Sequence, residues 1–141
     1  MKGAKTLNFI PSVKKLVKRL PLLLQERLPA KIVVISIPSS KSRALNRQYR
    51  KKDRATSVLS FRYSDKYGEI LVCPPVIRAE AKAQQHTFQY QMTWMIAHGM
   101  MHLSGLHHEK SREAGKRVAR LEKKILQDLF QKSGSQHHHL A

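Results

Sequence analysis

Residues 95–108 of the chain read Met-Ile-Ala-His-Gly-Met-Met-His-Leu-Ser-Gly-Leu-His-His, and this stretch is the most informative part of the sequence. His98 and His102 are four residues apart, so a helix places both imidazoles on one face, close enough to share a metal ion. Gly105 follows where such a helix would end, and glycine can adopt the left-handed conformation that reverses the chain. The segment therefore predicts a helix and a following turn that together carry a metal site.

The reversal at the glycine can return His108 as the third ligand, with His107 as the alternative. Three neutral imidazoles at about 2.0 to 2.1 Å from zinc leave one position for water, which distinguishes a catalytic zinc site from a structural one. The spacing His-x-x-x-His-x-x-Gly-x-x-His is also that of metzincin proteases, but these carry Glu directly after the first His. Here that position is Gly99. The pattern predicts one zinc ion per chain and disfavours a metallopeptidase, which remains an alternative.

The length of the chain and its single cysteine limit the classes of protein. At 141 residues the chain fits one domain, predicted at 1–132, followed by a polar, disordered tail at 133–141. No apolar stretch is long enough to span a bilayer and no export signal is recognisable, so we expect a cytoplasmic protein without a membrane contact. Cys73 is the only cysteine, which excludes an intramolecular disulfide, and its apolar surroundings indicate a core position.

Positive charge is the second strong feature. The chain holds 27 Lys and Arg against 9 Asp and Glu, a net charge of +18. Residues 1–60 contribute 15 basic and two acidic residues, a balance of +13. Such a surface attracts polyanions and displaces counterions from phosphates, so nucleic acid is the predicted partner. A solubility adaptation or a contact with an anionic membrane surface is the alternative.

Hydrophobic periodicity predicts a mixture of short strands and amphipathic helices. Two neighbouring strands with a turn at 64–68 predict an antiparallel hairpin. In the last two helices, Met92, Met95, Ile96 and Trp94 are expected in the core, as are Val118, Leu121, Ile125 and Leu129. The predicted strands are 7–10, 31–37, 57–63 and 69–73. The predicted helices are 11–28, 39–49, 76–86, 88–104 and 112–130. Pro21 is expected to interrupt the first helix, and Ser39 or Ser40 is expected to cap the second.

Four motifs occur in one order along the chain: ALNRQYR at 44–50, ATSVLSF at 55–61, GEI at 68–70 and HGMMHLSGLHH at 98–108. Together they resemble the YbeY family of bacterial endoribonucleases that mature ribosomal RNA, and the resemblance extends roughly from residue 7 to 129. It implies an α+β fold in which a small mixed sheet of about four strands packs with helices. It also implies zinc bound by His98, His102 and His108, on a helix and the following turn.

The resemblance further implies a zinc-dependent, single-strand-specific endoribonuclease that acts in small-subunit ribosomal RNA maturation and ribosome quality control. Its partners would be ribosomal RNA and the small ribosomal subunit. Arg50 closes the first motif and is implied as a catalytic or phosphate-binding residue, which suits the planar fork of arginine. Arg47, Lys51, Lys52 and Arg54 extend the same basic edge and are expected to bind RNA.

Several acidic positions of the family pattern are altered in this chain. Ser57 stands where Asp is usual, Gln91 where Glu is common, and Leu106-His107 where Tyr-Asp precedes the last ligand, while Glu69 replaces Asp. Loss of a carboxylate behind a metal ligand can cost roughly 10 to 100-fold in affinity or activity. His107 is therefore our candidate for the acid or base at neutral pH. The alternative function is a ribosome-associated RNA-binding factor with weakened catalysis.

Overall fold

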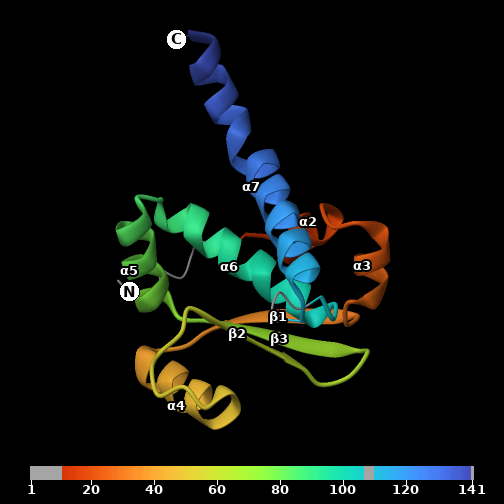
Figure 1. The fold of residues 1–141 in the computed structure, drawn as a ribbon, viewed down its shortest axis with the longest axis vertical. Helices are drawn as coiled ribbons and strands as arrows, with labels where there is room; N and C mark the ends of the chain where they lie inside the picture. The colour runs from red at the N-terminus through yellow and green to blue at the C-terminus, as the bar shows by residue number, and fades with distance from the viewer. Residues whose placement is uncertain (1–10, 107–109, 141) are drawn as a thin grey trace.

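A mixed three-stranded sheet divides the helices into two unequal layers (Figure 1). The computed structural model describes residues 11–106 and 110–140, and the side chains of all of these except 131–140. The described elements are α2 (Val13–Lys18), α3 (Leu22–Arg27), β1 (Lys31–Ser36), α4 (Ser39–Arg50), β2 (Val58–Arg62), β3 (Tyr67–Val72), α5 (Pro74–Gln84), α6 (Phe88–Leu103) and α7 (Arg112–Leu140).

The strand order is β1-β3-β2, with β3 in the centre. β1 pairs with β3 in parallel, and β2 pairs with β3 as an antiparallel hairpin, as predicted. The α+β class with a small mixed sheet is confirmed. Of the roughly four strands predicted, the described residues contain three, and the fourth, at 7–10, lies outside them. Because β2 is an edge strand, one of its two long sides is not paired with another strand of this sheet.

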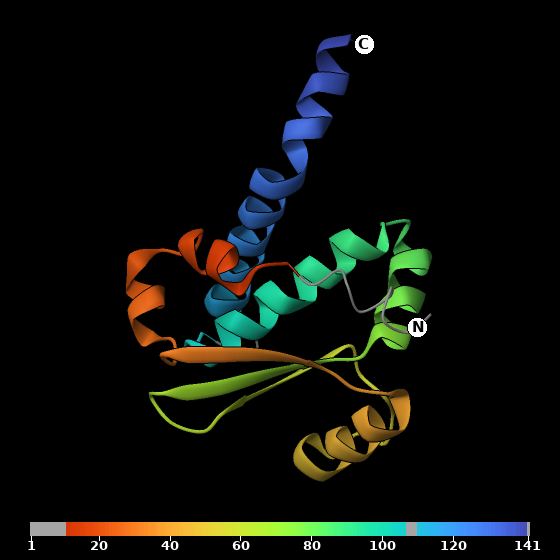
Figure 2. The same cartoon turned by 180° about the vertical axis from the view of Figure 1, so that it is seen from behind.

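Helices α2, α3, α5, α6 and α7 lie on one face of the sheet, and α4 lies on the other (Figures 1 and 2). The larger core is formed between the first group and the sheet, with Ile70, Ile96 and Met100 fully buried. A second, smaller core under α4 contains Leu59 and Cys73, so the predicted core position of the cysteine is confirmed.

Helix α6 crosses the sheet at very short range, and Gly99 makes this possible. A Cβ atom at Gly99 would lie 2.9 Å from Ser60 Oγ and 3.0 Å from Ile70 Cγ2. Ser60 Oγ in turn donates a hydrogen bond to the Gly99 carbonyl at 3.2 Å. A side chain at position 99 would therefore have to enter the packed space between helix and sheet.

Apart from the C-terminal end of α7, the predicted boundaries of the described elements hold within a few residues, with informative differences. Pro21 separates α2 from α3, as expected. The predicted serine cap of α4 is wrong, because Pro38 occupies the N-cap position and no side chain caps the helix. Helix α5 begins at Pro74, earlier than predicted, because proline fits the first turn of a helix.

Helix α7 continues to Leu140 and points away from the rest of the molecule (Figure 1). Its backbone is thus helical through 133–140, where the sequence predicts a disordered tail, and the domain boundary at 132 stays a prediction. Val118 and Ile125 are buried as predicted, and Leu121 and Leu129 pack against the core. None of the helices in 11–106 and 110–140 is long and apolar enough to cross a membrane.

Candidate metal and phosphate site

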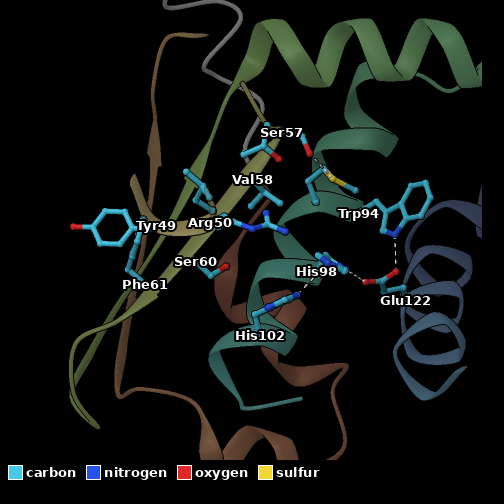
Figure 3. A pocket seen from close by; sticks show the side chains of 13 residues that line it. Tyr49, Arg50, Ser57, Val58, Ser60, Phe61, Trp94, His98, His102 and Glu122 are labelled. Carbon is cyan, nitrogen blue, oxygen red and sulfur yellow. Dashed lines mark hydrogen bonds and ion pairs between the residues drawn. The ribbon is translucent and has the colours of Figure 1, made fainter. Parts of the chain in front are cut away.

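A cavity of about 580 Å³ opens between helix α6 and the edge strand β2 (Figure 3). Residues 57–61 of the sheet edge form one wall. The other wall comes from α6 and α7, and the end of α4 reaches the cavity around the sheet edge. Among the lining residues are Arg50, Trp94, His98, His102 and Glu122. The cavity therefore brings two of the predicted zinc ligands together with the predicted phosphate-binding arginine.

His98 and His102 lie on successive turns of α6, with ring centroids 4.8 Å apart. Their Nε2 atoms are 3.2 Å apart. Two nitrogens that bind one tetrahedral zinc at 2.0 to 2.1 Å lie about 3.3 Å from each other, so this separation matches a shared metal. At 3.2 Å the same two atoms can also share a proton in a hydrogen bond.

Glu122 of α7 lies behind His98. Its carboxylate is almost fully buried, with Oε2 2.5 Å from His98 Nδ1 and Oε1 accepting a hydrogen bond from Trp94 Nε1 at 2.7 Å. A carboxylate on Nδ1 selects the tautomer whose Nε2 is free of a proton and fixes the plane of the ring. Glu122 thus orients the ring of His98 in the way that a hydrogen-bonded carboxylate orients a histidine that binds zinc.

Sequence reasoning missed Glu122, although a signal was present. Val118, Leu121 and Ile125 form the buried stripe of α7, and Glu122 falls within it, four residues after the first and three before the last. A carboxylate on an apolar stripe must have a partner in the interior. The identity of that partner, 24 residues away in the sequence, required the structure.

Arg50 is the last residue of α4, and its guanidinium points into the cavity toward the histidine pair (Figure 3). The helix ends there because Lys51 adopts a left-handed conformation with φ of 60°. Two buried side chains of α4 fasten the basic loop that follows. Asn46 Nδ2 donates to the Arg54 carbonyl at 2.9 Å, and Ser42 Oγ bonds both the N–H and the carbonyl of Thr56 at 2.8 Å.

The basic residues predicted to bind RNA differ in their surroundings. Asp53 forms a two-bond ion pair with Arg43, at 2.8 and 3.1 Å, and lies 3.7 Å from Arg47. The hydrogen bond from Arg43 holds the pKa of Asp53 below its usual value, so this carboxylate stays charged and offsets part of the positive charge of Arg47. Lys51, Lys52 and Arg54 are exposed.

The altered acidic positions of the family pattern do not share one location. Ser57 lines the cavity and donates a hydrogen bond to Met95 Sδ at 3.1 Å. Gln91 is buried and pairs with His86 Nδ1 at 2.8 Å, and it is not among the described residues that line the cavity. Glu69 lies on the α4 side of the sheet. The carboxylate that orients a predicted ligand here is supplied by α7.

His107 and His108 lie outside the described residues. Within the described residues no group of three possible metal ligands is present, so the structure places two of the three predicted ligands. The donor set that it does place, two converging imidazole nitrogens with a carboxylate behind one of them, fits zinc.

The fold and the site define an α+β domain with one cavity at a sheet edge. Two histidines, one of them hydrogen-bonded to a buried carboxylate, and an arginine face this cavity. The chain belongs to the YbeY family, because the family profile described as Endoribonuclease YbeY matches residues 4–130. The resemblance found in the sequence motifs is thereby confirmed.

Individual relatives agree with this assignment. The chain is 35% identical over 132 residues to Endoribonuclease YbeY of Cupriavidus metallidurans, a match that covers 90% of this chain and 66% of that protein. It is 31% identical over 132 residues to Endoribonuclease YbeY of Thermotoga maritima, covering 92% and 84%. The solution structure of the Thermotoga maritima protein TM1509 is similar with a TM-score of 0.59 and 29% identity, covering 96% of this chain and 89% of that one.

Proposed function

We propose that this protein is a zinc-dependent endoribonuclease that cleaves single-stranded regions of small-subunit ribosomal RNA during maturation and quality control of the ribosome. Membership of a family whose relatives are named endoribonucleases supports the reaction class. The observation that carries the proposal is the cavity, in which Arg50 faces the converging Nε2 atoms of His98 and His102. We expect the protein to act in the cytoplasm, where bacterial ribosomes assemble.

The proposed ligands of one zinc ion are His98, His102 and His108, the last of which lies outside the described residues. The chemistry that zinc supplies when bound is that of a Lewis acid near the scissile phosphate. Glu122 holds His98 in the required tautomer and orientation, and Trp94 holds Glu122 through its indole N–H. These contacts preorganise the ligand before any metal or substrate arrives.

Arg50 is proposed to bind the phosphodiester. Its guanidinium can donate two parallel hydrogen bonds to phosphate oxygens and stabilise the negative charge that grows there during cleavage. The cavity is bordered by α6 on one side and β2 on the other, and we expect a phosphate to enter it where the RNA strand turns inward between them. An unpaired strand can make this turn more readily than a duplex, which supports a preference for single strands.

The described part of the cavity offers few side chains that could donate or accept a proton during cleavage. Glu122 is the single carboxylate among the described residues that line the cavity, and both of its oxygens are already hydrogen-bonded to His98 and Trp94. His107, outside the described residues, is proposed as the acid or base. The same observation favours the second candidate, a ribosome-associated RNA-binding factor in which cleavage is weakened.

A metallopeptidase is disfavoured by the packing of Gly99. In a metzincin the residue after the first histidine supplies the general-base carboxylate. In this chain even a Cβ atom at position 99 would collide with Ser60 and Ile70, on the side of α6 that faces the sheet. A general base at this position would require the helix, or the Ser60 and Ile70 side chains that it packs against, to move.

Metal content and RNA cleavage, measured on the same samples, test the proposal. The background protein carries alanine at His137, His138 and His139, so that the polar tail cannot bind zinc. One zinc per chain and cleavage of a single-stranded ribosomal RNA fragment, both lost in His98→Ala/His102→Ala, are expected. Arg50→Ala should keep its zinc and lose about 10²-fold in cleavage rate, and Arg50→Lys, which keeps the charge without the fork, should recover only part of it.

The outcomes separate the candidates. Zinc with normal RNA affinity but no cleavage would favour the binding factor. Zinc-dependent cleavage of a peptide that competing RNA does not inhibit would restore the peptidase. Wild-type protein without stoichiometric zinc would contradict the metal site on which the proposal depends.

A further inference from the structure

One face of the sheet is only partly covered. Helix α4 lies under one end of it, and the β2–β3 hairpin extends beyond the helix (Figures 1 and 2). Alternate residues of the hairpin point to this face, because side chains of a strand alternate between the two faces. They are Phe61 and Tyr63 from the β2 strand and its end, and Tyr67 and Glu69 from β3, with Phe61 directly opposite Glu69.

The three aromatic residues of this set and Tyr49 at the end of α4 supply two pairs of contacting rings, which together we call the aromatic platform (Tyr49, Phe61, Tyr63 and Tyr67). Tyr63 and Tyr67 stack with centroids 5.7 Å apart and planes inclined by 29°. Tyr49 meets Phe61 edge to face at 5.1 Å. Tyr63 and Tyr49 are 62% and 58% exposed, and exposed rings that gather on one face are typical of an interaction site.

Glu69 holds the stacked tyrosines in place. The Tyr63 hydroxyl donates to Glu69 Oε1 at 3.0 Å, and the Tyr67 hydroxyl donates to Oε2 at 2.6 Å. These hydrogen bonds raise the pKa of both tyrosines, which in an ordinary tyrosine already lies well above neutral pH, and both hydroxyls are therefore protonated. The two rings are therefore fixed and uncharged before anything binds, which lowers the entropy cost of stacking a ligand on them.

The platform is continuous with the proposed active site around the edge of β2. Tyr49 and Phe61 line the same cavity as the histidine pair, from the opposite side of the strand (Figure 3). Arg50, next to Tyr49 in the chain, points from this edge into the cavity, and the exposed Lys51 and Lys52 follow it. An RNA strand carries both phosphates and bases. The cations at the edge of β2 are placed to bind its phosphates, and the rings on the adjoining face are placed to stack on its bases.

We propose that the aromatic platform stacks unpaired bases of single-stranded RNA whose neighbouring phosphodiester enters the cavity. This rests on the proposed function in requiring RNA as the ligand. Rings displayed on a sheet can stack two or three bases, and such stacking tolerates any sequence because every base has a flat face. The platform thus supplies affinity for unpaired strands without a sequence preference.

Binding of single-stranded RNA of about 12 nucleotides tests the platform. Affinity is measured by fluorescence anisotropy, with the RNA checked for integrity on a gel. Tyr63→Ala should weaken binding by about 5- to 150-fold, the range for loss of one stacked base. Tyr63→Phe, the matched control, keeps the ring without its bond to Glu69 and should stay within about threefold of wild type. Both variants should melt close to wild type, because Tyr63 is exposed.

A second RNA ligand distinguishes binding through base stacking from binding through phosphate charge. An abasic strand of equal length carries the same phosphates without bases, so wild type and Tyr63→Ala should bind it equally. Arg50→Ala should weaken binding of both strands. Wild-type RNA affinity in Tyr63→Ala, with Arg50→Ala impaired, would overturn the platform and leave the proposed function intact. Equal losses in Tyr63→Ala and Tyr63→Phe would overturn stacking, and absence of RNA binding by wild type would overturn both proposals.

Discussion

Glu122 accepts hydrogen bonds from two donors at once, so a neutral side chain of the same shape is a poor replacement for it. His98 Nδ1–H and Trp94 Nε1–H each require an acceptor, and the two carboxylate oxygens supply one apiece. Glutamine has the same shape but only one acceptor, so its NH₂ group must face one of the two donors. The pair of contacts is therefore specific for a carboxylate.

Glu122→Gln is accordingly expected to weaken zinc binding by about 10- to 100-fold, because His98 loses the partner that fixes its tautomer and ring plane. Competition with a chelating dye measures the zinc affinity. Trp94 fluorescence, recorded without metal, should stay near that of wild type in this variant, because the glutamine oxygen still accepts from the indole while its NH₂ group faces His98. Glu113→Gln, an exposed position on the same helix, is the matched control. Wild-type zinc affinity in Glu122→Gln would contradict the assigned role.

At the scale of elements, helix α6 combines what the sequence could and could not predict. Its limits, its buried methionines and the pairing of His98 with His102 follow from periodicity within one segment. Its distance from the sheet does not, because Ser60 and Ile70 belong to distant strands. The hairpin β2–β3 was predictable from two neighbouring runs, whereas the parallel pairing of β1 with β3 joins segments separated by α4.

The close approach of α6 to the sheet predicts the effect of Gly99→Ala. In an open helix this change would stabilise by about 1 kcal/mol through helix propensity. Here the added Cβ meets Ser60 Oγ and Ile70 Cγ2, and overpacking of a dense core costs about 1 to 3 kcal/mol. We expect a net loss of about 1 kcal/mol in the free energy of unfolding, measured by urea denaturation.

Ser60→Ala supplies the internal control for this prediction. It removes one of the two atoms in the collision, so Gly99→Ala should cost less in the Ser60→Ala background than in the wild type. If Gly99→Ala stabilises the protein equally in both backgrounds, helix propensity alone explains it, and the helix does not approach the sheet as closely as described.

For the whole molecule, the proposed RNA path predicts that the position of the charge matters more than its total. The net charge of +18 could attract RNA to any side. The proposed path instead uses the edge of β2, where α4 ends and the exposed Lys51, Lys52 and Arg54 follow. Helix α2 carries another exposed basic group, Lys14, Lys15 and Lys18, on the opposite side of the sheet (Figure 1).

The two groups allow a charge-matched comparison. Replacing Lys51, Lys52 and Arg54 with alanine should reduce the slope of log affinity against log salt concentration by about 2, since each phosphate contact on a single strand contributes about 0.7. Replacing Lys14, Lys15 and Lys18 removes the same formal charge and should leave the slope near that of wild type. Anisotropy titrations over a series of KCl concentrations measure both slopes. Counterions are released only where phosphates are contacted, so equal reductions in the two variants would mean that both basic groups contact the strand and would contradict a path confined to the edge of β2.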